Sequence, residues 1–327
     1  MKKTLLFSLL VFLMFFSCKK HQPHFYTFYY KKKNFALTPA EKSILQDAEV
    51  PYLYTRFFDV NKEKGFFTFS GAVSKDSTFQ TDKKIVPVIS VNSVCFQNIK
   101  GNEILSLAEN IHNRTEALSQ ELQLNTEKEI QIDCDWTPET KDHYFQFLNE
   151  LKKISGKEIS STIRLHHVKE KDETGIPPVE KVYLICYSSG ESLEKFNRKA
   201  VLNLPRLKTY LRRLDDYPIQ KIDVVLPVYS FGKITFDSGE QKIVKGISLN
   251  DLKNPDFKII SENEAEVKKG GHHFGYSLKK GTKIKVKQIK DGQLDEAVYY
   301  IDRKISGYHI IYDELEGDFV ENHSFKR

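Results

Sequence analysis

Apolar positions along the chain follow two periods, one of two residues and one of three to four. Short apolar or alternating runs predict eight strands, at residues 25–30, 51–60, 85–91, 129–136, 161–168, 181–187, 221–229 and 307–312. Apolar residues three to four apart predict helices at residues 39–49, 102–124, 138–154, 191–214 and 294–305. Eight strands mostly separated by helices most simply form an α/β fold, a TIM-like (β/α)8 barrel, although a doubly wound sheet with a β-subdomain also fits this pattern.

The segment between the seventh strand and the last helix departs from this alternation. Residues 230–289 contain short β-like runs, glycine pairs and charges, and we interpret them as a β-rich insertion before the last helix and strand of a single domain, residues 25–327. Within the insertion, residues 268–290 alternate lysines with Ile and Val. This pattern is most typical of a solvated strand face and less often of a contact with a membrane surface or a polyanion.

The stretch EIQIDCDW, residues 129–136, places two carboxylates and a Trp at the end of a predicted buried strand. Its apolar and polar residues alternate, so a period of two puts Gln131, Asp133 and Asp135 on one face. That face should line a cleft or a barrel interior. Thr137 and Pro138 follow as the predicted N-cap and first residue of a helix.

The first 18 residues predict an export signal. Lys2 and Lys3 precede an apolar run, residues 5–16, which is shorter than the roughly 20 residues needed to cross a bilayer. Cys18 follows a small residue at the end of this run, and this arrangement resembles the lipobox of bacterial lipoproteins. The resemblance implies lipidation of Cys18 and a membrane anchor in the bacterial cell envelope, with the outer membrane favoured and residues 19–24 as a tether. An ordinary cleaved signal is the alternative.

Composition narrows the possible partners. With 327 residues, 40% of them hydrophobic, the chain can bury a sizeable core. The formal net charge of +6 includes Lys2 and Lys3, and the remaining excess of four is too small to indicate nucleic-acid binding. Beyond Cys18, three cysteines lie in or beside apolar runs, which favours buried free thiols over one disulfide or a nucleophile: Cys95, Cys134 and Cys186. The sequence has neither a nucleotide-binding glycine loop nor a convincing metal cluster, so no cofactor is implied, and it does not indicate an oligomeric state.

The C-terminal ends of the predicted strands carry the candidate chemistry, because active groups of (β/α)8 barrels lie at that end. Those ends hold carboxylates, aromatic rings and a few cations: Tyr29, Tyr30, Arg56, Asp59, Asn92, Asp133, Asp135, Trp136, Arg164, His166, His167, Tyr187, Tyr229, Asp313 and Glu314. This mixture is typical of a sugar-binding cleft, since rings stack on sugar faces and carboxylates accept sugar hydroxyls or act as acid and base. The expected substrate-binding residues are Arg56, Trp136, Arg164, His166, Tyr187 and Tyr229.

The order of the segments FFDV, IQIDCDWT, TIRLHHV and DVVLPVYSFG resembles an uncharacterised family of bacterial envelope proteins, often lipoproteins, that are related to barrel glycosidases. The pair Asp133 and Asp135 is also similar to the fourth-strand motif of chitinase-like glycosidases. That motif continues to a catalytic Glu, where this chain has Thr137, and begins with an Asp, where this chain has Ile130. The resemblance implies a glycosidase-like barrel that acts on a carbohydrate, while the two departures count against a chitinase-like, substrate-assisted mechanism.

The enzyme hypothesis is hydrolysis of a glycosidic bond by Asp133 and Asp135. Hydrolases normally take their two carboxyls from opposite sides of the cleft, so a partner from another strand is needed, and Asp59 and Glu191 are the preferred candidates. Asp135 is expected to be the general acid, with a pKa raised by Asp133 and by partial burial near Trp136.

Other hypotheses assign these residues no catalytic role. Asp133 and Asp135 can form a buried ion-pair network with Arg56 and Arg164. The barrel can bind a glycan or a partner protein without catalysis, or serve only as a structural envelope lipoprotein. His166 and His167 should point to opposite faces of their predicted strand, which argues against a shared metal ion.

Overall fold

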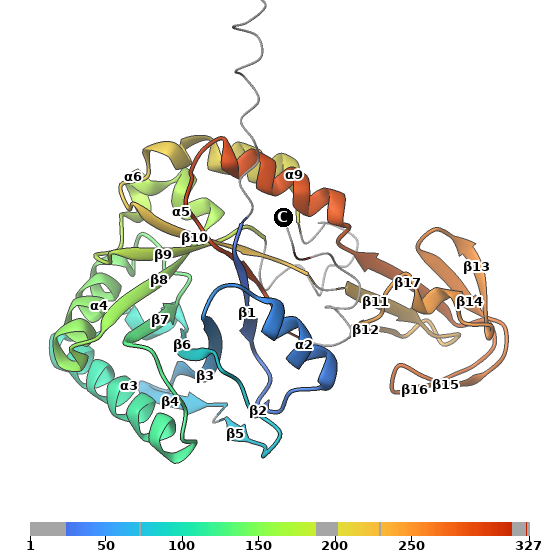
Figure 1. Ribbon diagram of the computed structural model, residues 1–327, viewed down its shortest axis with the longest axis horizontal. Coiled ribbons are helices and arrows are strands. Elements are labelled where there is room, and N and C mark those ends of the chain that lie inside the picture. The colour runs from blue at the N-terminus through green and yellow to red at the C-terminus, as the bar shows by residue number, and fades with distance from the viewer. Residues whose placement is uncertain (1–23, 72, 188–201, 229, 316–324, 326–327) are drawn as a thin grey trace, which may run out of the picture.

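The computed structural model describes residues 24–71, 73–187, 202–228, 230–315 and 325 of the chain. Eight parallel strands close into a barrel (Figure 1): β1 (Tyr26–Tyr30), β3 (Tyr52–Glu63), β6 (Lys84–Val91), β7 (Glu129–Asp133), β8 (Glu158–Arg164), β9 (Lys181–Ile185), β10 (Lys221–Leu226) and β18 (Ile310–Tyr312). The barrel is closed because β1 pairs with β18 on one side and with β3 on the other. The predicted (β/α)8 barrel is confirmed, and the doubly wound alternative is wrong.

Helices pack around the barrel between consecutive strands. They are α2 (Pro39–Asp47), α3 (Gly101–Glu121), α4 (Lys141–Ser155), α5 (Leu165–Lys169), α6 (Lys171–Thr174), α8 (Leu204–Tyr210) and α9 (Asp291–Asp302), with 3-10 turns η1 (Ser93–Phe96) and η2 (Leu211–Asp216). In α3, Ile104, Leu107 and Ile111 form one buried stripe, which is the spacing of three to four residues that predicted these helices. Along the described part of the chain, no helix combines the length and the apolar character needed to span a bilayer.

The connection from β3 to β6 contains no helix in its described residues. Strand β4 (Phe66–Ser70) instead folds back antiparallel on β3, and β5 (Ser74–Lys75) pairs with β2 (Asn34–Phe35). The predicted leader and the lipidation site at Cys18 lie outside the described residues. His24 is the first described residue, and its Nε2 lies 2.7 Å from Asp302 Oδ1 on α9.

Two predicted boundaries are wrong, and a third lies outside the described residues. The strand predicted at residues 161–168 ends at Arg164, and α5 follows at once because His167 Nδ1 accepts a hydrogen bond from the Arg164 amide. Helix α4 begins at Lys141 instead of Pro138, since the Thr140 hydroxyl accepts a hydrogen bond from the Thr137 amide in a preceding turn. The helix predicted at residues 191–214 is described only from residue 202 on, where α8 begins at Leu204 and has Pro205 in its first turn, a position that tolerates the missing N–H.

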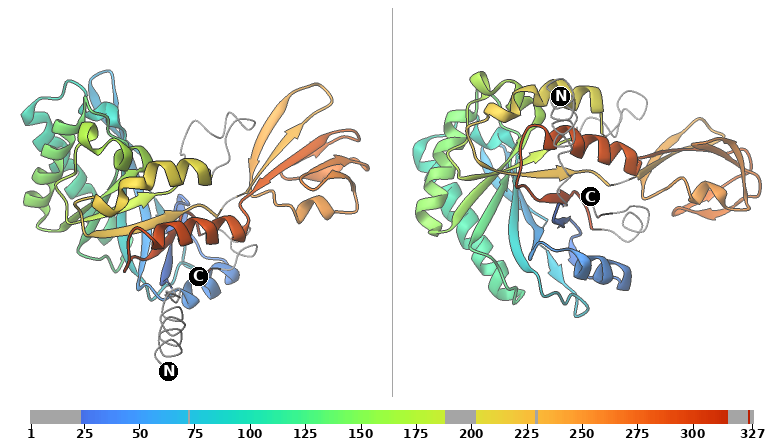
Figure 2. Two further views of the ribbon diagram at one scale, coloured as in Figure 1. Left: turned by 90° about the horizontal axis from the view of Figure 1, so that it is seen from above. Right: turned by 45° about the horizontal axis from the view of Figure 1, so that its top comes forward.

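The β-rich insertion forms its own sheet between β10 and α9, and Figure 2 shows it projecting from one side of the barrel. Its strands, in sheet order, are β12 (Gln241–Lys245), β11 (Ser230–Thr235), β17 (Lys283–Gln288), β14 (Glu264–Val267) and β13 (Phe257–Ser261), with a hairpin of β15 (Gly271–His273) and β16 (Tyr276–Leu278) and the turn η3 (Asp251–Lys253). One face of this sheet buries a small core that includes Ile234, Ala265 and Ile284.

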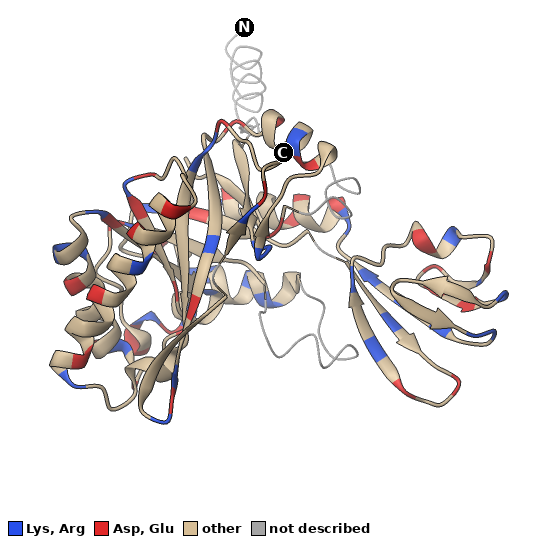
Figure 3. Ribbon diagram, turned by 90° about the horizontal axis from the view of Figure 1, so that it is seen from below, with Lys and Arg blue, Asp and Glu red and all other residues tan. Residues whose placement is uncertain are grey.

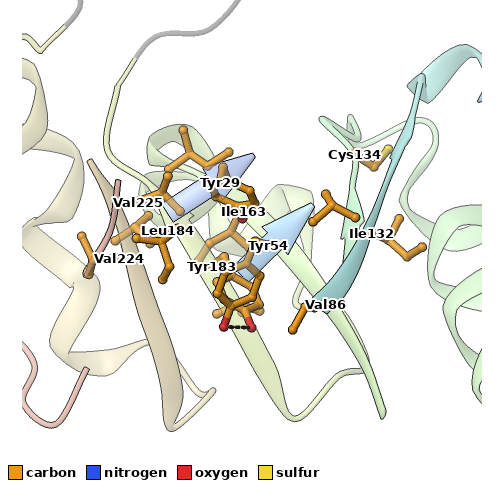
Figure 4. Packing of buried hydrophobic residues seen from close by; sticks show 14 of the residues in the cluster. Tyr29, Tyr54, Val86, Ile132, Cys134, Ile163, Tyr183, Leu184, Val224 and Val225 are labelled. Atoms are coloured by element: carbon orange, nitrogen blue, oxygen red, sulfur yellow. Dashed lines mark hydrogen bonds between the residues drawn. The ribbon is translucent and has the colours of Figure 1, made fainter. Parts of the chain in front are cut away.

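Side chains fill the barrel at the N-terminal end of its strands. The Tyr183 hydroxyl donates its proton to Glu129 Oε1 at 2.5 Å, and it is also hydrogen-bonded to the Tyr54 hydroxyl, as Figure 4 shows. The Lys181 ammonium lies 3.7 Å from Glu129 Oε2 and 3.1 Å from Asp223 Oδ2. These side chains form a packed plug at this end, in which one lysine faces two carboxylates.

Candidate functional site

The predicted polar face of residues 129–136 lines the C-terminal end of the barrel interior. The Tyr29 hydroxyl reaches across from β1 and donates to Gln131 Oε1 at 2.6 Å. Strand register places Asp133 beside Ser90 of β6, and Ser90 beside Asp59 of β3. Because paired positions point to the same face of a sheet, these side chains share one layer at the barrel mouth. The prediction that Gln131 and Asp133 face inward is therefore confirmed.

Asp133 is held as a carboxylate by its neighbours on β8. Its Oδ1 accepts hydrogen bonds from Thr162 Oγ1 and Arg164 Nη2, both at 2.8 Å, and Arg164 Nη1 also donates to the Thr162 hydroxyl. Burial alone would raise the pKa of Asp133, but the Arg164 charge and these hydrogen bonds outweigh it, so the pKa is lowered. No described residue hydrogen-bonds to Asp133 Oδ2, which leaves this oxygen for a substrate or water.

Two buried donors near Asp133 have no hydrogen-bond partner among the described residues, Gln131 Nε2 and Arg164 Nε. The Tyr29 hydroxyl fixes the orientation of the Gln131 amide by occupying its oxygen. An unpaired buried donor is costly, so a polar group or water is expected to satisfy each of them. Both donors belong to the layer that also contains Asp133.

Asp313 directly follows β18, and its pKa is shifted in the opposite direction from that of Asp133. It is 4% exposed, forms an ion pair with Lys31 and accepts a hydrogen bond from Tyr187. Burial dominates over both of these partners, and the nearby Glu314 charge adds to it, so the pKa of Asp313 is raised. The carboxylates of Asp133 and Asp313 both contribute to the raised pKa of Tyr29, after burial, which places both near the Tyr29 hydroxyl.

Asp135 lies beyond the end of β7, and 52% of its side chain is exposed. Its Oδ1 is 3.2 Å from His166 Nε2 and 3.7 Å from His167 Nε2. Burial acts to raise its pKa, but the hydrogen bond from His166 and the Arg164 charge prevail and lower it. The expected raised pKa of Asp135 is therefore wrong, because its nearest partners are cations and donors and not Asp133.

Trp136 is fully buried and cannot be the predicted sugar platform. Its ring stacks on His167 with centroids 3.7 Å apart and on Tyr144 at 5.2 Å, and its Nε1 donates to the Thr174 carbonyl. It therefore anchors the end of β7 against α4, α5 and α6. The position of Trp136 at a strand end is typical of a sugar platform, but side chains from later segments of the chain bury its ring.

Asp135, His166 and His167 form the one group of potential metal ligands within the described residues. The expectation that the two histidines point apart is wrong, because they lie on α5 and not on a strand. His167 Nδ1 accepts from the Arg164 amide and its Nε2 donates to the Trp136 carbonyl, so neither nitrogen has a lone pair for a metal. Burial and the neighbouring His166 lower the pKa of His167 to about 3. This group does not fit a metal ion.

Arg56 and Asp59 pair with each other on β3, with 2.6 Å between Arg56 Nε and Asp59 Oδ1. Their side chains are 40% and 37% exposed. The hypothesis of an aspartate network with both arginines is thus only half right, since Arg164 binds Asp133 while Arg56 binds Asp59. Glu191 and Tyr229 lie outside the described residues.

Two residues of this layer were missed as site candidates, Lys31 and Thr162, while Gln131 was predicted to face inward without a role and Asp313 was noted only as a strand-end residue. Lys31 lies two residues beyond Tyr29 and Thr162 two residues before Arg164, so the period of two could have identified them. The three described cysteines are buried free thiols, as predicted, and burial raises the pKa of each, which makes them poor nucleophiles: Cys95, Cys134 and Cys186.

Comparisons with known proteins support the fold. No protein-family profile matches the chain, and no curated protein is similar to it in sequence. Among solved structures, the spore cortex-lytic enzyme SleL of Bacillus cereus is similar at 16% identity with a TM-score of 0.54, over 92% of this chain and 74% of that one. SleL of Bacillus megaterium QM B1551 gives 15% identity and 0.54, over 93% and 75%. A chitinase from Bacteroides thetaiotaomicron gives 11% identity and 0.50, over 90% of each chain.

Proposed function

We propose that this chain hydrolyses a glycosidic bond of a carbohydrate at the mouth of its barrel. The proposal rests on two carboxyls at one barrel end whose pKa values are shifted in opposite directions: the pKa of Asp133 is lowered and that of Asp313 is raised. Two carboxyls with pKa values shifted apart can act as base and acid in glycoside hydrolysis. The similar barrels named as a cortex-lytic enzyme and a chitinase lend support to this choice of reaction.

In this mechanism Asp313 is the general acid and Asp133 the general base. Asp313, whose pKa is raised by burial, gives its proton to the glycosidic oxygen as the bond to the anomeric carbon breaks. Asp133, kept ionised by Arg164, accepts through Oδ2 a proton from the water that attacks this carbon. Gln131 Nε2 and Arg164 Nε donate to sugar hydroxyls. Asp135 and Asp59 remain candidates for binding the sugar, since both are partly exposed at the same end.

The test is hydrolysis of a polysaccharide array by the purified protein and by Asp133→Asn and Asp313→Asn. Loss of general acid or base catalysis typically lowers kcat by about 10²- to 10⁴-fold, and each variant is expected to fall in that range. Asp142→Asn, an exposed aspartate on α4, is the matched control and should retain activity. Asp313→Asn should also remove the basic limb of the pH profile. Full activity of both variants on a substrate that the wild type cleaves would refute the acid/base assignment.

Glycan binding without catalysis is the second candidate function, favoured by Thr137. This residue stands where the chitinase-like motif has its catalytic Glu, and its amide is hydrogen-bonded to the Thr140 hydroxyl in a turn. Binding of a glycan on the array without any released fragment, with binding lost in Asp133→Asn, would select this function over hydrolysis.

We also propose that the protein is a lipoprotein of the bacterial cell envelope, anchored through Cys18 and directed to the outer membrane. The support comes from sequence: an apolar run too short to span, followed by a small residue and a cysteine. Cys18→Ala should move the protein from the membrane fraction to the soluble fraction of cells, and an unchanged distribution would contradict the anchor.

A further inference from the structure

The chain directly before β1 is fixed to the base of the barrel, by which we mean the end at which its parallel strands begin. The His24 ring stacks on Tyr308 with centroids 4.2 Å apart, and its Nε2 lies 2.7 Å from Asp302 Oδ1. The Tyr308 hydroxyl donates to the same carboxylate oxygen at 2.8 Å. Asp302 ends α9 and Tyr308 precedes β18, so two elements hold the chain before it enters the barrel. An anchor on the preceding residues is therefore attached at the base.

The tether proposed between Cys18 and this fixed point is short compared with the barrel. The tether from Cys18 to His24 is six residue steps long, and at about 3.5 Å per step an extended chain covers at most about 20 Å. Strand β3 has 12 residues, so at about 3.3 Å per residue and a tilt of about 36° its two ends are about 30 Å apart along the barrel axis. The mouth lies at the far end of β3, where the hairpin with β4 extends beyond it. A bilayer that holds Cys18 therefore cannot lie across the mouth.

Phe25 presents an exposed aromatic ring at the base. It is 56% exposed, whereas Tyr26 beside it in the sequence is 3% exposed. A period of two puts Phe25 on the same inward face of β1 as Thr27 and Tyr29, so its ring lies beneath the barrel interior instead of packing against a helix. The His309 ring lies beside it, with centroids 6.4 Å apart. A large apolar side chain at the end that carries a lipid anchor can enter the boundary between lipid headgroups and acyl chains.

Charge does not favour a different side of the barrel as the one that faces the membrane. Figure 3 shows blue and red segments interspersed over the barrel. At the base itself, Lys84 Nζ lies 2.9 Å from Glu127 Oε2 and Lys181 Nζ lies 3.1 Å from Asp223 Oδ2. A surface on which both signs alternate has little net attraction to an anionic bilayer. The attachment point of the tether and the Phe25 ring therefore decide which surface faces the lipid.

We propose that the base of the barrel is the membrane-facing surface of this protein, with Phe25 at the lipid interface and the mouth directed away from the bilayer. The inference rests on the proposed lipid anchor at Cys18. It also narrows the substrate class of the proposed hydrolysis, because a site that opens away from the bilayer receives a glycan polymer outside the membrane. The sugar of a lipid in the same bilayer lies on the wrong side of the barrel.

The experiment places a tryptophan at either end of the barrel in the lipidated protein. Phe25→Trp marks the base, and Phe66→Trp is the matched control, since the native ring on β4 beyond the mouth is 77% exposed. Each variant is bound to vesicles of phosphatidylethanolamine and phosphatidylglycerol, with and without a lipid that carries a nitroxide quencher. Interfacial side chains enter the headgroup boundary by about 5 to 10 Å, so the quencher should lower the emission of Phe25→Trp by about half and leave that of Phe66→Trp unchanged. Trp136, the one native tryptophan, is fully buried and adds the same background to both.

Three results with vesicle-bound protein would overturn the inference. Equal quenching of the two variants would mean that the barrel lies on its side, and stronger quenching of Phe66→Trp would mean that the mouth faces the bilayer. Quenching of neither variant would mean that the base is held away from the lipid. Failure of the protein to float with the vesicles is a different result, because it would remove the proposed anchor and this inference together.

Discussion

Replacing Arg164 by Met should destabilise the fold at neutral pH and release the pKa of Asp133. Arg164 and Asp133 are 11% and 29% exposed and lie 2.8 Å apart. Two unit charges about 4 Å apart at an effective dielectric of 20 attract by about 4 kcal/mol, and partial exposure of Asp133 reduces this. We therefore expect the free energy of unfolding to fall by about 2 to 3 kcal/mol at pH 7. Urea unfolding followed by fluorescence measures it.

The pH dependence gives this prediction its sign. The folded-state pKa of Asp133 is lowered, so its contribution to stability is present at neutral pH and is lost as the pH falls through the acid range. Without Arg164 that contribution disappears. The difference in the free energy of unfolding between wild type and variant should therefore decrease from pH 7 to pH 3.

A double-mutant cycle isolates the pair from other effects. The cycle of Arg164→Met with Asp133→Asn should give a coupling of about 2 kcal/mol. Arg56→Met with Asp59→Asn is the matched control, and because that pair is 40% and 37% exposed, its coupling should stay below about 1 kcal/mol. Equal coupling energies in the two cycles would refute the view that Arg164 keeps Asp133 ionised. So would a loss of unfolding free energy in Arg164→Met that does not change with pH.

Further predictions concern residues around α5. Trp136→Ala should lower the free energy of unfolding by about 3 to 5 kcal/mol, measured by urea unfolding, because the ring is fully buried; a stable variant with weakened glycan binding would restore the sugar-platform hypothesis. His167 has a pKa lowered to about 3, so protonation of the unfolded state removes stability as the pH falls below about 6.5. Unfolding between pH 8 and pH 5 should show a loss of about 2 kcal/mol that His167→Gln abolishes, and an equal loss in the variant would contradict the assignment.

The barrel could be predicted from the sequence because its strands and helices have distinct periods. The run at residues 85–91 is apolar except for Ser90, as expected for a strand covered on both faces, and α3 has a clear stripe of period 3.6. The boundary at Arg164 could not be predicted, because the strand ends there through a hydrogen bond to the His167 ring. Histidine is not among the usual capping residues, and the segment STIRLHHV therefore resembles one continuous strand.

The location of the candidate site could be predicted from the sequence, but the pKa shifts of its carboxyls could not. The polar alternation around Asp133 indicated an inward-facing strand end, and the structure confirms this for Gln131 and Asp133. The pKa of each carboxyl depends on partners from distant segments, such as Lys31 and Tyr187 for Asp313. Sequence adjacency suggested that Asp133 would raise the pKa of Asp135, whereas the strand ends between them and Asp135 turns toward α5.

The electrostatics of the two barrel ends differ in a way that supports the choice of mouth. At the N-terminal end, Lys181 lies between Glu129 and Asp223, although Asp223 Oδ2 has no hydrogen-bond partner among the described residues. At the C-terminal end, Gln131 Nε2 and Arg164 Nε have no described partner, and the pKa of Asp313 is raised. Unsatisfied donors and a carboxyl that favours its proton are destabilising in an isolated fold, so a bound polar ligand that satisfies them gains affinity. The electrostatics and the sequence motif therefore indicate the same end of the barrel.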